Sequence, residues 1–127
     1  MREILFRGKS KSTGKWVYGY LVEGNDWNTN EPITAIIETD AVFYPRNEIV
    51  SYEVVDPRSV GQFTGKVDKN GVKIFEGDIV RAMMDFGPAG FYERIITIGF
   101  ANNLGSYQWE YFDMSTIEVI GSSYDRI

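Results

Sequence analysis

Short segments rich in Val, Ile, Tyr and Phe recur along this chain, and Gly, Asn, Asp or Pro separates one from the next. Such segments are typical of β-strands, whereas the i, i+3, i+4, i+7 apolar spacing of an amphipathic helix is hard to find. The pattern predicts strands at residues 4–6, 16–22, 33–38, 41–44, 49–55, 73–75, 78–84, 92–100, 107–112 and 117–120. One helical turn is expected at 113–116, where Asp113 or Ser115 can cap it. We therefore expect a mainly β fold, α+β at most.

The dipeptide Asp56-Pro57 interrupts the series of strands, because proline excludes the helical conformation at the residue before it. We place a subdomain boundary close to it, with an N-terminal β-rich subdomain at 1–59 and an evenly spaced set of strands at 60–127. Within the first subdomain, the stretch GNDWNTNEP at 24–32 has the composition of an exposed loop.

Cysteine and histidine are both absent from the 127 residues. Their absence excludes disulfides, thiolate nucleophiles, Ser-His-Asp and Cys-His triads and the usual zinc sites. We therefore predict a protein that is not an enzyme and holds no metal or cofactor. The formal net charge of −5 disfavours general nucleic-acid binding, which depends on clustered Lys and Arg. The opening residues do not read as a signal peptide and no apolar stretch reaches membrane-spanning length, so we expect a cytoplasmic protein with no membrane partner.

The stretch QFTGKVDKNGVKIFEGDIV at 62–80 predicts a β-hairpin, because its Asp-Lys-Asn-Gly run at 68–71 is a strong turn signal. A calcium loop would need Glu at its twelfth position, where this chain has Ile79. Glu76 and Asp78 either form a corner or, on one strand face, a carboxylate pair suited to hydrolysis. Residues 6–22 share with the stretch at 62–80 a Phe-x-Gly-Lys start and a later element that contains an aromatic residue and Gly. The likeness reflects either two hairpins with similar turns or a duplication.

Three motifs in the second half resemble the signature of the YopX family of phage and prophage proteins: VGQFTG at 60–65, DKNG at 68–71 and FEGDIV at 75–80. The family's opening and closing motifs are matched by FR at 6–7, WVYG at 16–19, EVIG at 118–121 and YD at 124–125. Ser122 and Ser123 depart from the closing pattern. The resemblance spans 2–125. It implies a phage- or prophage-encoded protein whose N-terminal β or α+β portion precedes an SH3-like β-barrel at about 60–127, and it implies no particular activity.

Aromatic side chains mark candidate binding surfaces. If 107–112 is a strand, Tyr107, Trp109 and Tyr111 share one face, which is either a stacking or partner surface or the barrel core. Trp27 lies in the polar loop, where it either anchors an interface or folds back over the core.

Lys9 and Lys11 belong to a basic segment at 2–15, the candidate patch for phosphate contact. Three functions remain open. The first is a non-enzymatic interaction or self-assembly module, a homo-oligomer joined through strand edges or aromatic contacts, with a phage or host protein as another partner. The second is a nucleic-acid-binding SH3-like module that uses the basic segment and the 107–111 aromatic face. The third is a carboxylate-dependent hydrolase that uses Glu76 and Asp78.

Overall fold

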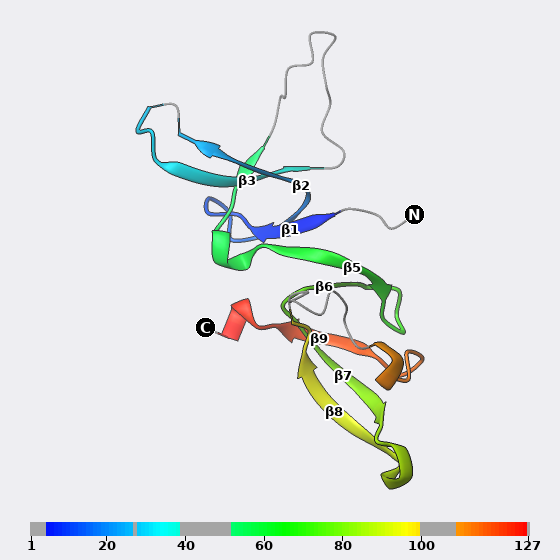
Figure 1. The fold of residues 1–127 in the computed structure, drawn as a ribbon. Helices are drawn as coiled ribbons and strands as arrows, with labels where there is room; N and C mark the ends of the chain where they lie inside the picture. Colours follow the sequence, from blue (N-terminus) through cyan, green and yellow to red (C-terminus); the bar gives the residue numbers. More distant parts are fainter. Residues whose placement is uncertain (1–4, 27, 39–51, 100–108, 127) are drawn as a thin grey trace. The chain divides into compact units, whose positions relative to one another are not determined.

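The computed structural model describes residues 5–26, 28–38, 52–99 and 109–126. It divides the chain into two compact units, Met1–Gln62 and Phe63–Ile127. Both units are built from antiparallel strands joined by turns and short 3-10 helices, which confirms the predicted mainly β fold (Figure 1). In the described ranges, no helix is both long enough and apolar enough to cross a membrane.

The described residues of the first unit form the strands β1 (Phe6–Lys9), β2 (Trp16–Asn25), β3 (Pro32–Glu38) and β4 (Glu53–Val54). They pair in the order β4-β3-β2-β1, and the first residues of β5 (Gly61–Val67) pair with β1. The predicted break at Asp56-Pro57 begins the 3-10 helix η1 (Pro57–Ser59). Asp56 caps this helix by accepting a hydrogen bond from the Arg58 N–H at 3.0 Å.

The β2–β3 connection is shorter than the expected loop at 24–32, because β2 extends to Asn25 and β3 begins at Pro32. Asp26 Oδ1 organises this turn by accepting the N–H groups of Asn28 at 2.8 Å and Thr29 at 3.0 Å. These two backbone donors lower the pKa of the Asp26 carboxyl. Trp27 lies outside the described residues.

Close packing of backbone and side chains holds the first unit together. Ile36 and Val55 are fully buried. A Cβ at Gly8 would come within 2.8 Å of the Val55 side chain, so glycine is needed for this contact. The predicted strand at 49–55 is present only as the short β4 among its described residues, and the predicted strand at 41–44 lies outside them.

The second unit contains the rest of β5, followed by β6 (Lys73–Phe75), β7 (Asp78–Asp85), β8 (Phe91–Thr97) and β9 (Glu118–Ser122), with the 3-10 helices η2 (Gly87–Ala89), η3 (Trp109–Tyr111) and η4 (Tyr124–Arg126). β5 and β6 form a hairpin with a shifted register, and the other strands form a sheet in the order β8-β7-β9. The SH3-like barrel expected for this half stays a prediction.

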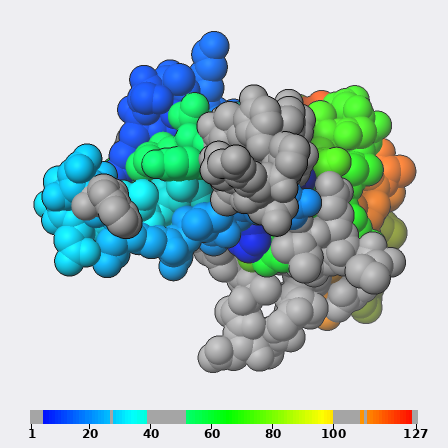
Figure 2. All heavy atoms as spheres, turned by 90° about the horizontal axis from the view of Figure 1, so that it is seen from above, coloured from blue at the N-terminus to red at the C-terminus, as the bar shows by residue number. Residues whose placement is uncertain are grey.

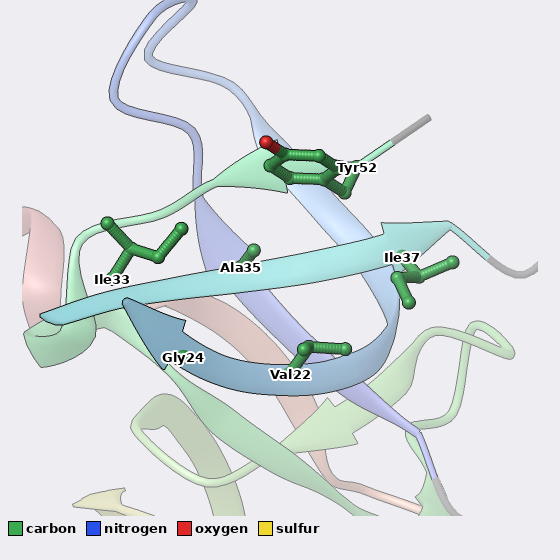
Figure 3. Close-up of a pocket in the computed structure, with 6 residues that line it drawn as sticks. All are labelled: Val22, Gly24, Ile33, Ala35, Ile37 and Tyr52. Atoms are coloured by element: carbon green, nitrogen blue, oxygen red, sulfur yellow. The ribbon is translucent and has the colours of Figure 1, made fainter. Parts of the chain in front are cut away.

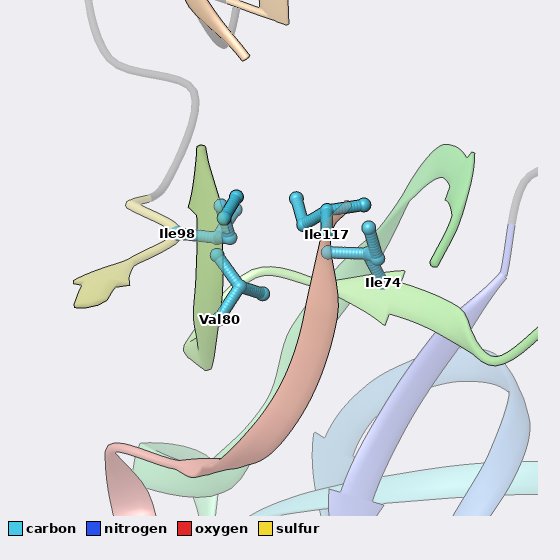
Figure 4. Packing of buried hydrophobic residues seen from close by; sticks show 5 residues of the cluster. Ile74, Val80, Ile98 and Ile117 are labelled. Carbon is cyan, nitrogen blue, oxygen red and sulfur yellow. The ribbon is translucent and has the colours of Figure 1, made fainter. Parts of the chain in front are cut away.

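A hydrophobic cluster fills the second unit. Its buried members come from β6, β7 and the segments beside the strands, namely Ile74, Val80, Ala82, Ile98 and Ile117 (Figure 4). Trp109 and Phe112 pack against this cluster, with their ring centroids 5.8 Å apart. Burial of aliphatic and aromatic area of this kind is the main term that favours folding.

The predicted strand at 107–112 is wrong for its described part, because Trp109–Tyr111 forms the 3-10 helix η3. The expected helical turn at 113–116 is a hydrogen-bonded turn. The Asp113 carboxylate accepts from the Ser115 N–H at 3.1 Å, and the Thr116 N–H donates to the Asp113 carbonyl at 3.0 Å. Asp113 thus caps this turn as expected from the sequence, without a helix following it.

Candidate interaction surface

β2 places a row of aromatic side chains on one face of the first unit's sheet. Alternate residues of a strand point to opposite faces, and residues opposite each other in an antiparallel pair share a face. The unbroken registers put the following residues on one side, called here the aromatic face: Arg7, Lys9, Trp16, Tyr18, Tyr20, Val22, Gly24, Ile33, Ala35, Ile37 and Val54. The opposite face carries Phe6, Gly8, Val17, Gly19, Leu21, Glu23, Asn25, Pro32, Thr34, Ile36, Glu38 and Glu53.

Several apolar side chains of the aromatic face are open to solvent. The exposed fractions of Tyr18, Tyr20 and Val22 are 43%, 54% and 41%, and Tyr52 beside β4 is 57% exposed. In the space-filling view the blue-to-cyan atoms of the first unit's strands reach the surface (Figure 2). Scattered exposed apolar residues are ordinary in folded proteins, but a contiguous row of them marks an interaction site.

A groove of about 250 Å³ lies at one end of the aromatic face (Figure 3). Its lining is apolar and comes from β2, β3 and the residue before β4: Val22, Gly24, Ile33, Ala35, Ile37 and Tyr52. Sites for drug-sized ligands usually enclose about 300–1,000 Å³, so this groove is suited to a single large side chain. A Cβ at Gly24 would meet no atom within 4 Å, so its missing side chain leaves space for an occupant.

The other end of the aromatic face is cationic. Arg7 Cζ lies 4.3 Å and Lys9 Nζ lies 4.7 Å from the centroid of the Trp16 ring, within the range of a cation–π contact. The β1–β2 turn adds the exposed Lys11 and Lys15 next to this end. One carboxylate approaches the turn, because Glu53 Oε2 accepts a hydrogen bond from Ser10 Oγ at 2.9 Å.

Charges of opposite sign lie on opposite faces of this sheet. Among the described residues of β1 to β4, both cations, Arg7 and Lys9, are on the aromatic face. The carboxylates of the same strands, Glu23, Glu38 and Glu53, are all on the opposite face. Arg7 is only 7% exposed, so the positive charge that this face presents to solvent comes from Lys9 and from Lys11 and Lys15 of the adjoining turn, although the whole chain carries a net charge of −5.

The described binding residues chosen from the sequence belong to both units. Lys9 lies on the aromatic face and Lys11 in the turn beside it, whereas Tyr111 is 47% exposed on η3 in the second unit. Trp109 packs against the second unit's core, as one of the two interpretations held. Trp27 and Tyr107 lie outside the described residues. A binding role for these residues stays a prediction.

Sequence reasoning overlooked the aromatic face itself. Its signal was present as the alternation Trp16, Tyr18, Tyr20 and Val22 within a correctly predicted strand. The groove could not be found in the same way, because its floor depends on which residues of β3 lie opposite β2.

The two carboxylates considered for hydrolysis do not lie on one strand. Glu76 belongs to the turn before β7, and Asp78 is the first residue of β7. Asp78 is 1% exposed, and its Oδ2 accepts the Phe75 N–H at 2.7 Å. This carboxylate holds the corner between β6 and β7, so we do not carry the hydrolase alternative further.

The second unit has an apolar surface of its own on β8, an edge strand of its sheet. Phe91, Tyr92 and Ile95 are 58%, 52% and 59% exposed. The Ile98 N–H donates to the Asp78 carbonyl, so the even-numbered residues turn their backbone groups towards β7. The backbone groups of residues 91, 93, 95 and 97 therefore point away from the sheet.

Comparison with known proteins gives a family and a solved structure. The family model described as "YopX protein" matches residues 5–126. A crystal structure of protein EF1440 from Enterococcus faecalis is similar over 96% of this chain and 94% of that chain, with 27% identity and a TM-score of 0.55. A search of curated proteins gave no match. Because the family model covers nearly the whole chain, this protein belongs to the YopX family.

Proposed function

We propose that this chain is a non-enzymatic module that binds a segment of another polypeptide on the aromatic face. The observation that carries the proposal is the row of exposed Tyr18, Tyr20 and Val22 that leads into an apolar groove. Tyrosine side chains bring large contact areas at low cost in conformational entropy, and a concave apolar pocket is the usual receptor for an anchor side chain. A phage or host protein stays the expected partner.

The proposal is tested by filling the groove. Gly24→Leu adds a side chain where a Cβ meets open space, so the strand keeps its pairing while the groove is occupied. Gly121→Leu is the matched control, since Gly121 lies in β9 of the second unit and also has open space around its Cβ. The probe is a short uncharged peptide with one leucine, titrated into the ¹⁵N-labelled full chain.

We expect the amide signals of Val22, Gly24 and Ala35 to shift in the original chain and in Gly121→Leu, and to stay unchanged in Gly24→Leu. Equal shifts in all three proteins would mean that the peptide binds elsewhere. Absence of any shift at millimolar peptide would remove the groove as a receptor.

Self-assembly through β8 is the second candidate, and the exposed edge of that strand favours it. A second copy related by a two-fold axis presents the same four residues, 91, 93, 95 and 97, so their outward backbone groups are complementary to each other. Light scattering over a range of concentrations tests it. We expect Ile95→Lys to lower the mass of an assembly, and Val67→Lys, also at an exposed site, to leave it unchanged. A monomer at all concentrations would overturn this candidate.

A further inference from the structure

The separation of charge between the faces of the first sheet bears on the chemistry of the bound segment. Approached from the aromatic face, a partner meets the half-buried Lys9 and the exposed Lys11 and Lys15 of the adjoining turn at one end, whereas Arg7 is buried. At the other end it meets an apolar groove, and no strand carboxylate lies on that face in the described ranges. We propose that the partner segment is an acidic polypeptide that lies extended along β2, with an apolar anchor in the groove and carboxylates at the cationic end. This inference rests on the proposed function.

The geometry of β2 fixes the spacing that such a segment needs. Trp16 lies opposite Lys9 at the cationic end, and Val22 lines the groove. A strand rises about 3.3 Å per residue, so the two ends are roughly 20 Å apart. An extended partner has a similar rise, which puts its carboxylates about six residues from its anchor.

The same face is less suited to single-stranded nucleic acid. Bases need open ring faces for stacking and polar groups that read their edges. Arg7 and Lys9 both lie over the Trp16 ring, which is therefore engaged with cations. Apart from the Tyr52 hydroxyl, the side chains that line the groove carry no polar atom. An acidic peptide with one apolar anchor matches both ends of the surface.

The test uses three synthetic peptides that differ in one feature. Each has a single leucine and, about six residues away, a short run of glutamate, serine or lysine, made in both chain directions. Each is titrated into the ¹⁵N-labelled full chain, and a short oligothymidine serves as a fourth probe. The signals of Gly24 and Ala35 report on the groove, and those of Lys9 and Trp16 report on the cationic end.

We expect the glutamate peptide to bind about tenfold more tightly than the serine peptide, with the difference shrinking at high salt. Lys9→Glu should move the preference towards the lysine peptide. Lys11→Glu with Lys15→Glu, both at exposed turn positions, is a second variant that leaves the β1–β2 ladder unaltered. Lys66→Glu is the matched control for Lys9→Glu, because it makes the same charge change at an exposed position of the second unit.

The outcomes separate the two proposals. Equal binding of the glutamate and serine peptides in the groove would overturn the acidic partner and leave the proposed function in place. If the lysine peptide binds most tightly, the acidic partner is likewise overturned and the proposed function stays in place. If oligothymidine binds more tightly than every peptide, the acidic polypeptide is overturned as the partner in favour of nucleic acid. If no peptide shifts the groove signals, both proposals fall.

Discussion

The hairpin of β1 and β2 and the hairpin of β5 and β6 share a sequence pattern, yet different interactions hold them. Both begin with Phe-x-Gly-Lys, and both turn at a glycine of positive φ, Gly14 at 73° and Gly71 at 82°. At the first turn, the small hydroxyl side chain of Ser10 bonds to Glu53. At the second turn, a buried carboxylate, Asp68, accepts hydrogen bonds from three backbone N–H groups.

Asp68 links its turn to a distant strand. Its Oδ1 accepts from Asn70 at 2.8 Å and from Val72 at 2.9 Å, and its Oδ2 accepts from Val119 in β9 at 3.0 Å. The first turn is linked to a distant segment by other groups: the Ser10 and Ser12 hydroxyls donate to Glu53, and the Lys11 N–H donates to the Val54 carbonyl, while its lysines are exposed. The comparison shows that one pattern can build a turn held by a buried carboxylate or a turn held by hydroxyl and backbone groups.

The later glycines of the two hairpins are needed for different physical reasons. A Cβ at Gly19 would overlap the carbonyl oxygen of Ile37, so a close approach of two strands requires glycine there. Gly77 has a φ of 91°, a conformation that other residues rarely adopt. Glycine at similar places in the pattern thus allows close strand packing in one unit and a backbone bend in the other.

The largest effect is expected at Gly19. Gly19→Ala forces the β2 and β3 backbones apart, and we expect it to lower the free energy of unfolding by about 3 kcal/mol or more. Urea unfolding measures the loss. Gly24→Ala is the control in the same strand, because its new Cβ meets open space. If the two variants unfold at the same urea concentration, the strands adapt to the methyl group and the steric argument is wrong.

The next effect is expected at the second turn. Asp68→Asn removes the charge that three backbone donors face, and we expect a loss of about 2–3 kcal/mol. Thermal or urea unfolding of the full chain measures it. A loss no greater than that of Ser10→Ala would show that the two turns are held equally strongly and would refute the expected difference between them.

The pH dependence of stability sharpens the same contrast. Burial acts to raise the pKa of Asp68, but the N–H groups of Val119, Val72 and Asn70 and the charge of Lys69 outweigh it and hold the pKa below its ordinary value of 3.8. A depressed pKa stabilises the fold at pH above the unfolded value, and this contribution disappears as the pH falls through the folded value.

We therefore expect the original chain to lose more stability than Asp68→Asn between about pH 5 and about pH 2. Urea titrations at several pH values in that range measure the difference. Parallel pH profiles for the two proteins would mean that Asp68 titrates alike in both states and would refute the assignment.

The smallest effect is expected at the first turn. Ser10 is 3% exposed, and its hydroxyl donates to Glu53 and accepts from the Thr13 N–H at 3.3 Å. Because the acceptor is the Glu53 carboxylate, we expect Ser10→Ala to cost about 1.5 kcal/mol, the low end of the range for a hydrogen bond to a charged group. A chemical denaturation midpoint resolves this loss. A loss of stability near that of Asp68→Asn would show that the first turn is held as strongly as the second.

Local chemistry made much of the β structure predictable from the sequence. Turn glycines, β-branched residues and alternation predicted the main body of β2, β3, β7 and β9, and β6 with its bounds. The strand expected at 107–112 failed because aromatic residues favour strands through packing, and Trp109 obtains its packing from the second unit's core while in a 3-10 helix.

Only part of the candidate surface could be predicted from the sequence. The alternation of Tyr18, Tyr20 and Val22 is local, and it predicts a shared face once the strand is known. The groove and the charge separation depend on the register of β2 against β3 and of β3 against β4. The register depends on where each strand ends and which residues then pair, and no single strand carries that information, so neither feature could be derived from the local pattern.

The arrangement of charge on the first sheet also affects how molecules approach it from solution. Cations on one face and carboxylates on the other give these strands an electric dipole directed across the sheet. The field of an anionic surface exerts a torque on such a dipole, and this torque turns the aromatic face towards the surface before contact. Orientation during diffusion then raises the rate of productive encounters, and added salt abolishes it at separations beyond about 10 Å. The net charge alone would instead predict a slow approach to an anionic surface, without a preferred orientation.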